Sequence, residues 1–156
     1  MITFLQGKLV SALPTQAIVD VAGVGYEIFI PLSSYDKLPA AGQAVQVLTH
    51  LHVREDAHIL YGFMTAAERD LFRLLVNNVS GIGPKLALAV LSGMSVSNFK
   101  SAVVNADIAS LSKISGLGKK TAERIVLELK DKLGVVAAWE AASAEHAPTA
   151  EQSQAN

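Results

Sequence analysis

The amino-acid sequence lacks cysteine, and this absence limits the chemistry that the protein can perform. Without thiols there are no disulfide bonds, no thiolate metal ligands and no cysteine nucleophiles, which fits a reducing compartment. No apolar run approaches the roughly 18 residues that a membrane-spanning helix needs, and the N-terminal segment MITFLQGKLV lacks the charged-then-apolar order of a signal peptide. We therefore expect a folded, cytoplasmic protein with no membrane partner.

Charged residues are also few, at 17% of the chain, and the net charge of −1 conceals an uneven distribution. Residues 1–65 carry three Lys/Arg against five Asp/Glu, a net −2. Residues 66–134 carry ten against six, a net +4, and residues 135–156 carry three Glu and no base, a net −3. A basic middle between acidic ends indicates a locally basic binding surface, which the whole-chain isoelectric point hides.

The first 65 residues have the pattern of short β-strands separated by turn residues. The strand-like stretches are ITFLQGKLVSAL, AIVDVAGVGYEIFIP with a break at residues 23–25, VQVLTHLHV and HILYGF. About five strands in a segment of this size predict a small OB-type β-barrel over residues 1–64. We expect four aromatic residues, Tyr26, Phe29, Tyr61 and Phe63, to fill the barrel, and a single helical turn capped by serines after Pro31.

From Thr65 the apolar period becomes helical, which predicts an all-α domain over residues 65–134 and an α+β, multi-domain fold. Thr65 and Glu68 form a capping box, and Ser95 and Asp107 are further predicted N-caps. The last helix is expected to end at Gly134. Residues 135–156 are interpreted as a flexible linker or tail that begins as an Ala-rich helix and is disordered from about His146, with no third domain.

Two stretches 35 residues apart, SGIGPKLALAVL at 80–91 and SGLGKKTAERIV at 115–126, repeat one pattern. In each, glycine, an apolar residue and a second glycine join two helical segments, and an alanine stands four residues beyond the second glycine. Glycine allows backbone angles that a Cβ disfavours, the apolar residue anchors the turn in the core, and alanine lets the helices approach closely. Two matched copies predict a tandem of helix-hairpin-helix motifs.

Such a turn offers bare N–H donors at the positive end of a helix macrodipole, which suits a phosphate group. Lysines lie just inside the following helices, and an arginine lies one turn further on. These cations would neutralise backbone phosphates without reading bases, so we expect sequence-independent, salt-sensitive DNA binding. The candidate DNA-binding residues are Gly81, Gly83, Lys85, Gly116, Gly118, Lys119, Lys120 and Arg124.

Two familiar phosphate-binding motifs fit the glycine turns less well. A Walker-type phosphate loop needs GxxxxGK followed by Ser or Thr, which the sequence does not contain. A dinucleotide-binding fingerprint follows a strand, whereas both glycine turns follow predicted helices. For one copy alone, glycines that merely end helices beside solvated lysines remain an equal alternative, but matched offsets in two copies favour the paired motif.

Candidate catalytic and metal sites are sparse. No hydroxyl lies in a GxSxG motif or near an evident His/Asp partner, and the carboxylates form no metal-nuclease cluster. His50 and His52 share a face of one strand and His58 lies on the next, but no further ligand completes a metal site. We expect these histidines to be solvated or to face DNA, and we expect no catalytic residue, metal or cofactor.

Four stretches give the chain a resemblance to a known family: VAGVGYEI at 21–28, THLHVREDAHILYGF at 49–63, GIGPKLALAVLSGMS at 81–95 and GLGKKTAERIVLELKDK at 116–132. With the barrel and the two hairpins, they closely resemble the bacterial RuvA family from Met1 to about Leu133. The resemblance implies a non-catalytic scaffold that binds four-way (Holliday) DNA junctions for branch migration in recombination, repair and the SOS response to DNA damage. It also implies that the ATPase activity resides in a partner, the RuvB motor.

The resemblance assigns roles to particular residues. The glycine turns and their cations would contact the phosphates of the junction arms. Glu55 and Asp56, with Arg54 adjacent in the stretch VREDA, match an acidic pin at the tip of a barrel hairpin. Four such pins at the junction centre would repel phosphates and oppose passage of an ordinary duplex. Without the family context, Glu-Asp at a strand turn is an ordinary hairpin tip.

The resemblance also implies an assembly and its partners. Members of the family form fourfold tetramers that hold the junction open and square-planar, and they work with the RuvB motor and the RuvC resolvase. We expect a homotetramer, alone or paired on a junction, that is cytoplasmic and nucleoid-associated when bound to DNA. The family continues through a linker into a third helical domain that docks on RuvB, whereas this sequence stops within what resembles the linker. We therefore expect junction binding without RuvB-driven branch migration.

Two other functions remain open. Paired helix-hairpin-helix motifs also occur in DNA-repair nucleases, so the chain could be the DNA-binding module of such an enzyme, although acidic clusters for cleavage are missing. The other alternative is a general duplex- or RNA-binding module with a barrel that binds single strands. Metal-dependent cleavage of a labelled junction, and competition between a junction and a linear duplex, distinguish these functions from a junction-binding scaffold.

Overall fold

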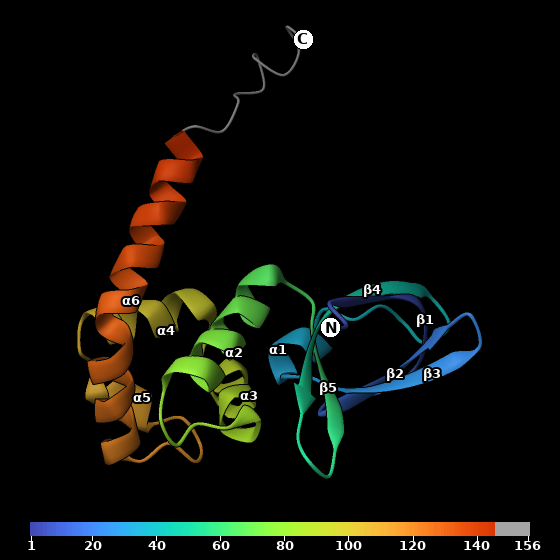
Figure 1. Ribbon diagram of the computed structural model, residues 1–156, viewed down its shortest axis with the longest axis horizontal. Helices are drawn as coiled ribbons and strands as arrows, with labels where there is room; N and C mark the ends of the chain where they lie inside the picture. The colour runs from blue at the N-terminus through green and yellow to red at the C-terminus, as the bar shows by residue number, and fades with distance from the viewer. Residues whose placement is uncertain (146–156) are drawn as a thin grey trace, which may run out of the picture.

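The computed structural model describes residues 1–145 and places two units next to each other: a small β-barrel and a bundle of short helices (Figure 1). Side-chain environments are described for residues 1–133. The final helix, α6 (Lys119–Glu145), begins in the bundle and projects beyond it (Figure 1). This architecture confirms the predicted fold class, an OB-type barrel followed by an all-α unit with two helical hairpins.

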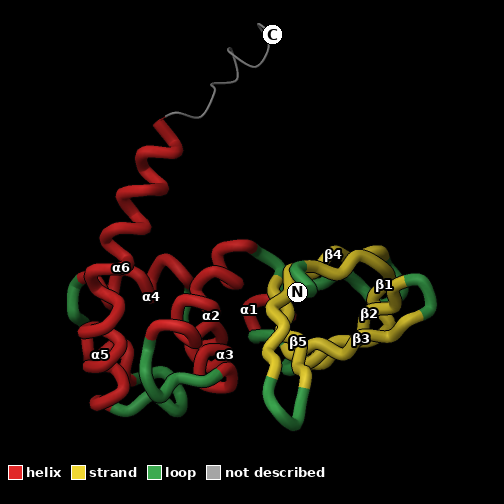
Figure 2. Tube along the Cα trace, in the orientation of Figure 1, coloured by secondary structure: helices red, strands yellow, loops and turns green. Residues whose placement is uncertain are grey.

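Five strands form the barrel, as their pattern in the sequence predicts. They are β1 (Phe4–Leu13), β2 (Gln16–Val21), β3 (Val24–Phe29), β4 (Ala44–Val53) and β5 (His58–Phe63). Their order is β1-β2-β3-β5-β4, and β4 pairs back with β1 to close the sheet, so that Figure 2 shows a ring of strands. All neighbours are antiparallel except β3 and β5. Closure leaves the sheet without a free edge strand.

Aliphatic side chains fill this barrel. Leu9, Val19, Ile28 and Val47 are each at most 1% exposed. A glycine on β5 makes room for them, because a Cβ added at Gly62 would lie only 2.7 Å from Cδ1 of Ile28 and 2.9 Å from Cγ1 of Val47. A larger residue at this point would therefore require the side chains of the barrel core to shift.

The helical unit contains α2 (Ala66–Asn78), α3 (Pro84–Gly93), α4 (Val96–Val104), α5 (Ile108–Ser112) and α6. The three predicted N-caps are present: side-chain oxygens of Thr65, Ser95 and Asp107 each accept a hydrogen bond, at 3.2 Å, from the backbone N–H three residues further on. The apolar faces of these helices pack into one core. Among residues 1–145 no single helix has the length and apolarity to cross a membrane; α3 and α4 meet those criteria only as a pair, which is bent by 100°.

The prediction that four aromatic rings fill the barrel is wrong for three of them. Tyr26 packs against the barrel core, but Tyr61 and Phe63 belong to the core of the helical unit, and Phe29 packs against that core. The ring centroids of Tyr61 and Phe63 lie 5.1 and 4.9 Å from that of Phe72 in α2. Successive side chains of a strand point to opposite faces, so these rings lie on the outer face of the barrel, where the helices cover it.

A single helical turn, α1 (Leu32–Tyr35), follows Pro31 as predicted, but the serines do not cap it. Pro31 holds the cap position and makes no side-chain hydrogen bond. Ser33 and Ser34 lie inside the turn and donate hydrogen bonds to the carboxylate of Glu68 in α2, at 3.0 and 2.6 Å. Their hydroxyl groups thus connect the barrel to the helical unit.

The predicted end of the last helix at Gly134 is wrong, because α6 continues to Glu145. Glycine in a helix interior costs about 1 kcal/mol relative to alanine, which weakens a helix without ending it. Five of the eleven residues 135–145 are alanine, the best helix former, so the helix continues. The division into residues 1–64, 65–134 and 135–156 stays a prediction, and the expected disorder from His146 lies outside the described residues.

Candidate nucleic-acid interface

Two helical hairpins carry the repeated glycine turns. Residues 80–83 join α2 to α3, and residues 115–118 join α5 to α6. The φ angles of Gly81 and Gly116 are 83° and 85°, in the left-handed region that a side chain disfavours, so the first glycine of each turn is required by its shape. Nearly equal angles at positions 35 residues apart confirm that the two turns are copies of one hairpin.

The apolar residue and the alanine of each hairpin do what the pattern predicts. Ile82 and Leu117, between the glycines, are 4% and 3% exposed and lie in the helical core. Ala87 and Ala122 are fully buried, and their N–H groups donate hydrogen bonds to the carbonyl oxygens of the second glycines at 3.1 and 2.9 Å. Buried residues thus anchor the inner side of each turn in the helical core, and the outer side of the turn is uncovered.

The second glycine of each turn has open space around it. A Cβ added at Gly83 or Gly118 would meet no atom within 4 Å, and the φ angle of Gly83, −95°, is one that any residue adopts. All four turn glycines are exposed. Within residues 1–133 their N–H groups have no hydrogen-bond acceptor. Bare amides therefore stand at the start of α3 and α6, where the helix dipole is positive, and this arrangement can bind a phosphate group.

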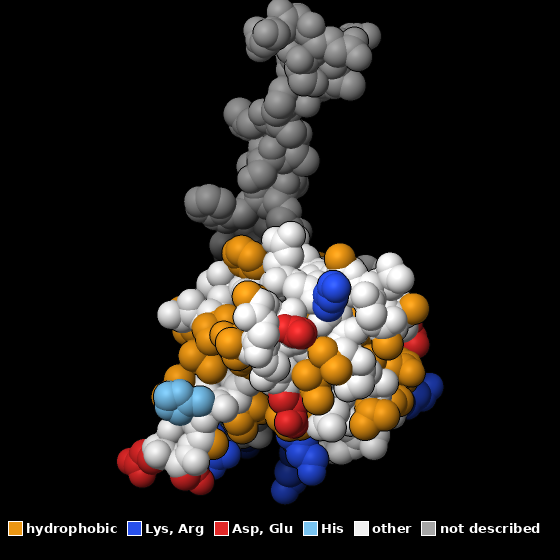
Figure 3. All heavy atoms as spheres, turned by 90° about the vertical axis from the view of Figure 1, so that its right-hand side faces the viewer, with side chains coloured by type: hydrophobic (Ala, Val, Ile, Leu, Met, Phe, Trp, Pro, Cys, Tyr) orange, Lys and Arg blue, Asp and Glu red, His pale blue; other side chains and the backbone are white. Residues whose placement is uncertain are grey.

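The predicted cations accompany these amides. Lys85, Lys119 and Lys120 are exposed in the first turns of α3 and α6. In Figure 1 both glycine turns and the β4–β5 turn point to the same, lower side of the molecule. Figure 3, rotated by 90°, shows basic and acidic side chains projecting along that lower edge. The structure thus brings the two hairpins and the acidic turn, which the sequence places far apart, onto one side.

Arg124, predicted as a phosphate contact, has a second role that sequence reasoning missed. Its Nη1 donates a hydrogen bond to the carbonyl oxygen of Ser80 at 3.0 Å, across to the other hairpin. One turn later on α6, Glu128 accepts the N–H of Ser80 at 2.9 Å. A further turn on, Lys132 donates to the side-chain oxygen of Asn78. We call Arg124, Glu128 and Lys132 the α6 clasp; the only sequence signal for it is their i, i+4, i+8 spacing.

The acidic residues of the predicted pin form the tip of the β4–β5 hairpin. The hairpin is closed by a hydrogen bond from the N–H of Arg54 to the carbonyl oxygen of Ala57, at 2.8 Å. Glu55 and Asp56 are exposed, and Nε of Arg54 lies 3.9 Å from a carboxylate oxygen of Asp56, too far for a hydrogen bond. Both carboxylates thus extend into solvent.

A buried carboxylate fixes the barrel against the hairpins. The side chain of Glu68 is 4% exposed, and it accepts hydrogen bonds from Lys37 and Ser34 at 2.6 Å each, as well as from Ser33 and Thr65. Burial by itself raises the pKa of this carboxyl, but these hydrogen bonds outweigh it and hold the pKa below its usual value. The sequence predicted only a capping role for Glu68; its partners from α1 lie more than 30 residues away.

The histidines do not all lie where they were expected. His50 is half-buried, with its ring 5.4 Å from that of Phe72, and its Nδ1 accepts a hydrogen bond from Nε of Arg73 at 3.3 Å. Burial, and then the positive charge of Arg73, lower the pKa of His50. The expectation that it is solvated or faces DNA is therefore wrong, because it packs between barrel and helices. Among the described residues no group of three His, Asp or Glu could hold a metal ion.

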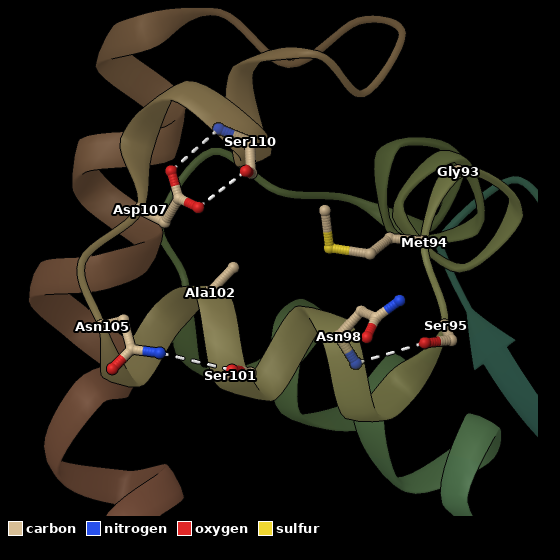
Figure 4. A pocket seen from close by; sticks show the side chains of 9 residues that line it. All are labelled: Gly93, Met94, Ser95, Asn98, Ser101, Ala102, Asn105, Asp107 and Ser110. Carbon is tan, nitrogen blue, oxygen red and sulfur yellow. Dashed lines mark hydrogen bonds between the residues drawn. The ribbon is translucent and has the colours of Figure 1, made fainter.

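A hollow of about 490 Å³ lies between α4 and α5 and is lined by small polar side chains (Figure 4). Several of its hydrogen-bonding groups are occupied locally. The Asp107 carboxylate accepts both the N–H and the hydroxyl of Ser110, Ser95 caps α4, and Asn105 donates to Ser101. These contacts cap helix ends and leave no charged group directed at a ligand.

An OB-type barrel, two hairpins with bare amides and lysines, and an acidic turn on the same side define a class of protein: a small barrel joined to a helix-hairpin-helix tandem. Comparison with known proteins places the chain within that class. The family model named RuvA N terminal domain matches residues 1–62, and the model named SAM-like Helix-hairpin-helix tandem matches residues 72–131. The chain belongs to the RuvA family, as relatives that match most of its length also show.

Proteins from several bacteria match most of the chain. The relative from Opitutus terrae is 53% identical over 138 residues, which cover 88% of this chain and 69% of that protein. The relative from Chromobacterium violaceum is 55% identical over 133 residues, 85% and 67%. One from Acidithiobacillus ferrooxidans is 53% identical over 137 residues, 88% and 70%. Each is named Holliday junction branch migration complex subunit RuvA.

Proposed function

We propose that this protein binds four-way DNA junctions as the RuvA subunit of a branch-migration complex. One observation carries the proposal: two copies of an amide-and-lysine turn lie on the same side as an acidic barrel hairpin in a member of the RuvA family. Relatives at 53–55% identity carry the name of that subunit. The function belongs to recombination and DNA repair.

The two hairpins would bind the DNA through its phosphates. The bare amides at Gly81, Gly83, Gly116 and Gly118 donate to phosphate oxygens, and the lysines of the following turns neutralise the charge. Neither group reaches a base edge in this role, so binding is independent of sequence. The complex weakens steeply as salt rises, because the cations that DNA binding releases return to the phosphates.

The acidic turn would make the protein prefer an open junction over a continuous duplex. The β4–β5 turn lies on the side of the hairpins (Figure 1), and its exposed residues Glu55 and Asp56 would repel phosphates. In a homotetramer, alone or paired, four such pins meet at the centre of an open junction, where strands separate and re-pair around them. An uninterrupted duplex across that point brings phosphates close to the carboxylates and is disfavoured.

The chemistry of branch migration would lie with the partners of this subunit. The RuvB motor hydrolyses ATP, the RuvC resolvase cleaves the junction, and this chain holds the DNA. We place the protein in the cytoplasm, associated with the nucleoid when it is bound to DNA.

Replacing Lys119 and Lys120 together by glutamate tests the hairpin assignment. We expect K119E/K120E to abolish binding to a labelled four-way junction at moderate salt, since two phosphate contacts become repulsive. The matched control is K8E/K130E, which changes the charge equally at two exposed lysines that make no described hydrogen bond or ion pair within residues 1–133. The control should keep most of the affinity. Affinity of K119E/K120E within about twofold of the parent would refute the assignment.

Two further measurements separate the proposal from its rivals. Competition between a junction and a linear duplex of equal length should favour the junction; equal competition indicates a general duplex-binding module. Incubation of the labelled junction with Mg²⁺ and the protein should leave the DNA intact, whereas cleavage indicates part of a nuclease. Native mass measurement with and without the junction reports the tetramer and its stoichiometry.

A further inference from the structure

We propose that Glu128 is a positioning residue for DNA binding: it holds the first glycine turn at a fixed place relative to the second. This rests on the proposed function of the hairpins. The Glu128 carboxylate accepts the N–H of Ser80 at 2.9 Å, and Ser80 stands immediately before Gly81. Glu128 itself belongs to α6, the helix that the second turn opens. One side chain thus ties the two turns together.

The geometry of the clasp explains why it positions the turn. Glu128 takes the N–H of Ser80 and Arg124 takes its carbonyl oxygen, at 2.9 and 3.0 Å. Both polar groups of one residue are therefore held by the same helix, which restricts rotation of the backbone where the chain leaves α2. Lys132 holds Asn78 two residues earlier. Gly81, the residue after Ser80, has a φ angle in the left-handed region and sets the direction of the bare amides.

The clasp runs in one direction only: side chains of the second hairpin hold the turn of the first, and the first hairpin has no equivalent residues. With the 35-residue offset, Gly93 and Ala89 stand in the first copy where Glu128 and Arg124 stand in the second. Neither can make the equivalent contacts. Within residues 1–133 the N–H and carbonyl of Ser115, the counterpart of Ser80, form no hydrogen bond. The second turn is thus continuous with α6, whereas the position of the first turn depends on side chains of α6 that contact Ser80.

The charge of Glu128 allows a positioning role to be distinguished from an electrostatic effect on DNA binding. An anionic side chain near a phosphate-binding surface repels DNA, so simple electrostatics predicts that losing the charge strengthens binding. A positioning role depends instead on an oxygen acceptor at the right distance from Ser80. Aspartate keeps the charge and loses the reach by one methylene, whereas glutamine loses the charge and keeps an acceptor.

The test compares E128D and E128Q with E123D and E123Q in the full chain. Glu123 lies on the same helix, is exposed, and makes no described hydrogen bond within residues 1–133, so it controls for charge and helix propensity. We expect E128D to raise the Kd for a four-way junction about fivefold over E123D, and E128Q to stay within about twofold of E123Q. Circular dichroism melting curves verify that all four variants are folded at the assay temperature.

Two outcomes overturn the proposal: equal affinities for E128D and E123D, or a loss in E128Q as large as that in E128D, which would mean that an oxygen acceptor at the right distance from Ser80 is not what supports binding. Hydrogen exchange of the Ser80 amide in the DNA-free protein provides an independent readout. It should exchange faster in E128D than in the parent, and unchanged exchange contradicts the clasp. Failure of the proposed function looks different, because then the parent shows no preference for the junction in the competition with duplex.

Discussion

At the residue scale, the first and second glycines of each turn are required for different reasons. Gly116 has a φ of 85° and an ordinary contact of 3.5 Å between an added Cβ and Leu86, so its need is conformational. Gly83 has an ordinary φ and no atom within 4 Å of an added Cβ, so nothing in the folded protein requires glycine there. A phosphate approaching the bare amide would require it, because a methyl group would occupy that space.

Alanine substitutions at these two positions should therefore separate stability from binding. We expect G116A to lower the free energy of unfolding by about 1 kcal/mol, the cost of a side chain in the left-handed region. We expect G83A to change it by less than about 0.5 kcal/mol, because the poorer cap and the less flexible unfolded chain offset each other. G83A should nevertheless weaken junction binding. Urea denaturation and junction titration measure the two quantities, and unchanged binding by G83A would contradict the role given to this amide.

At the scale of elements, the contact between α1 and α2 depends on Glu68. Its carboxylate is buried and hydrogen-bonded to Ser33, Ser34 and Lys37, which lie in or next to α1. The hydroxyl of Ser34 also accepts the N–H of Met64, so the cluster includes the segment between β5 and α2. This cluster fixes how the barrel, with its acidic turn, meets the helices that carry the hairpins.

Replacement of Glu68 by glutamine should make this contact weaker and less dependent on pH. We expect E68Q to lower the free energy of unfolding at pH 7 by about 2 kcal/mol, since hydrogen bonds to a charged group are lost. The folded-state pKa of Glu68 lies below its ordinary value of 4.5, so its stabilisation is present above that pH and is lost as pH falls through the folded pKa. The difference between parent and E68Q should therefore shrink in acid.

Denaturation at several pH values between 7 and 3 measures this difference. The control is E27Q, which removes an exposed carboxylate on β3 that makes no described hydrogen bond or ion pair. E27Q should stay within about 0.5 kcal/mol of the parent at pH 7. A difference between parent and E68Q that stays constant down to pH 3 would show that the ionised carboxylate is not what stabilises the contact.

At the scale of the whole molecule, charges of both signs lie on one side of a chain whose net charge is −1. In the proposed function, the exposed lysines of the hairpins attract the phosphates of DNA, and the exposed Glu55 and Asp56 repel them. Attraction is spread over two hairpins in each chain, whereas repulsion is confined to one turn. Such an arrangement selects the shape of the DNA and not its sequence.

Neutralising the acidic turn should thus reduce the preference of the protein for a four-way junction over a linear duplex. We expect E55Q/D56N to bind linear duplex several-fold more tightly than the parent and to lose part of its preference for the junction, because carboxylates no longer repel a continuous duplex. The control, E27Q/D36N, removes two exposed carboxylates elsewhere on the barrel unit and changes the net charge equally. Competition titrations measure both. An equal gain in duplex affinity in the control would assign the effect to net charge and not to the pin.

Much of this architecture was predictable because it is local. The caps at Thr65, Ser95 and Asp107 need only a backbone N–H three residues away. The hairpins follow from glycine spacing, and the barrel from strand length and turn residues. Local patterns misled at Gly134, where the helix propensity of the following residues outweighed one glycine.

By itself the sequence determined which segments are strands, helices and glycine turns, and where the bare amides and lysines lie along the chain. Only the tertiary structure decided which of them meet. The contacts of Glu128 and Arg124 with Ser80 join residues 48 and 44 positions apart, and those of Glu68 with Ser34 join residues 34 apart. The physical reason is that such pairs form only after whole elements pack, so their partners depend on the core and not on neighbouring residues.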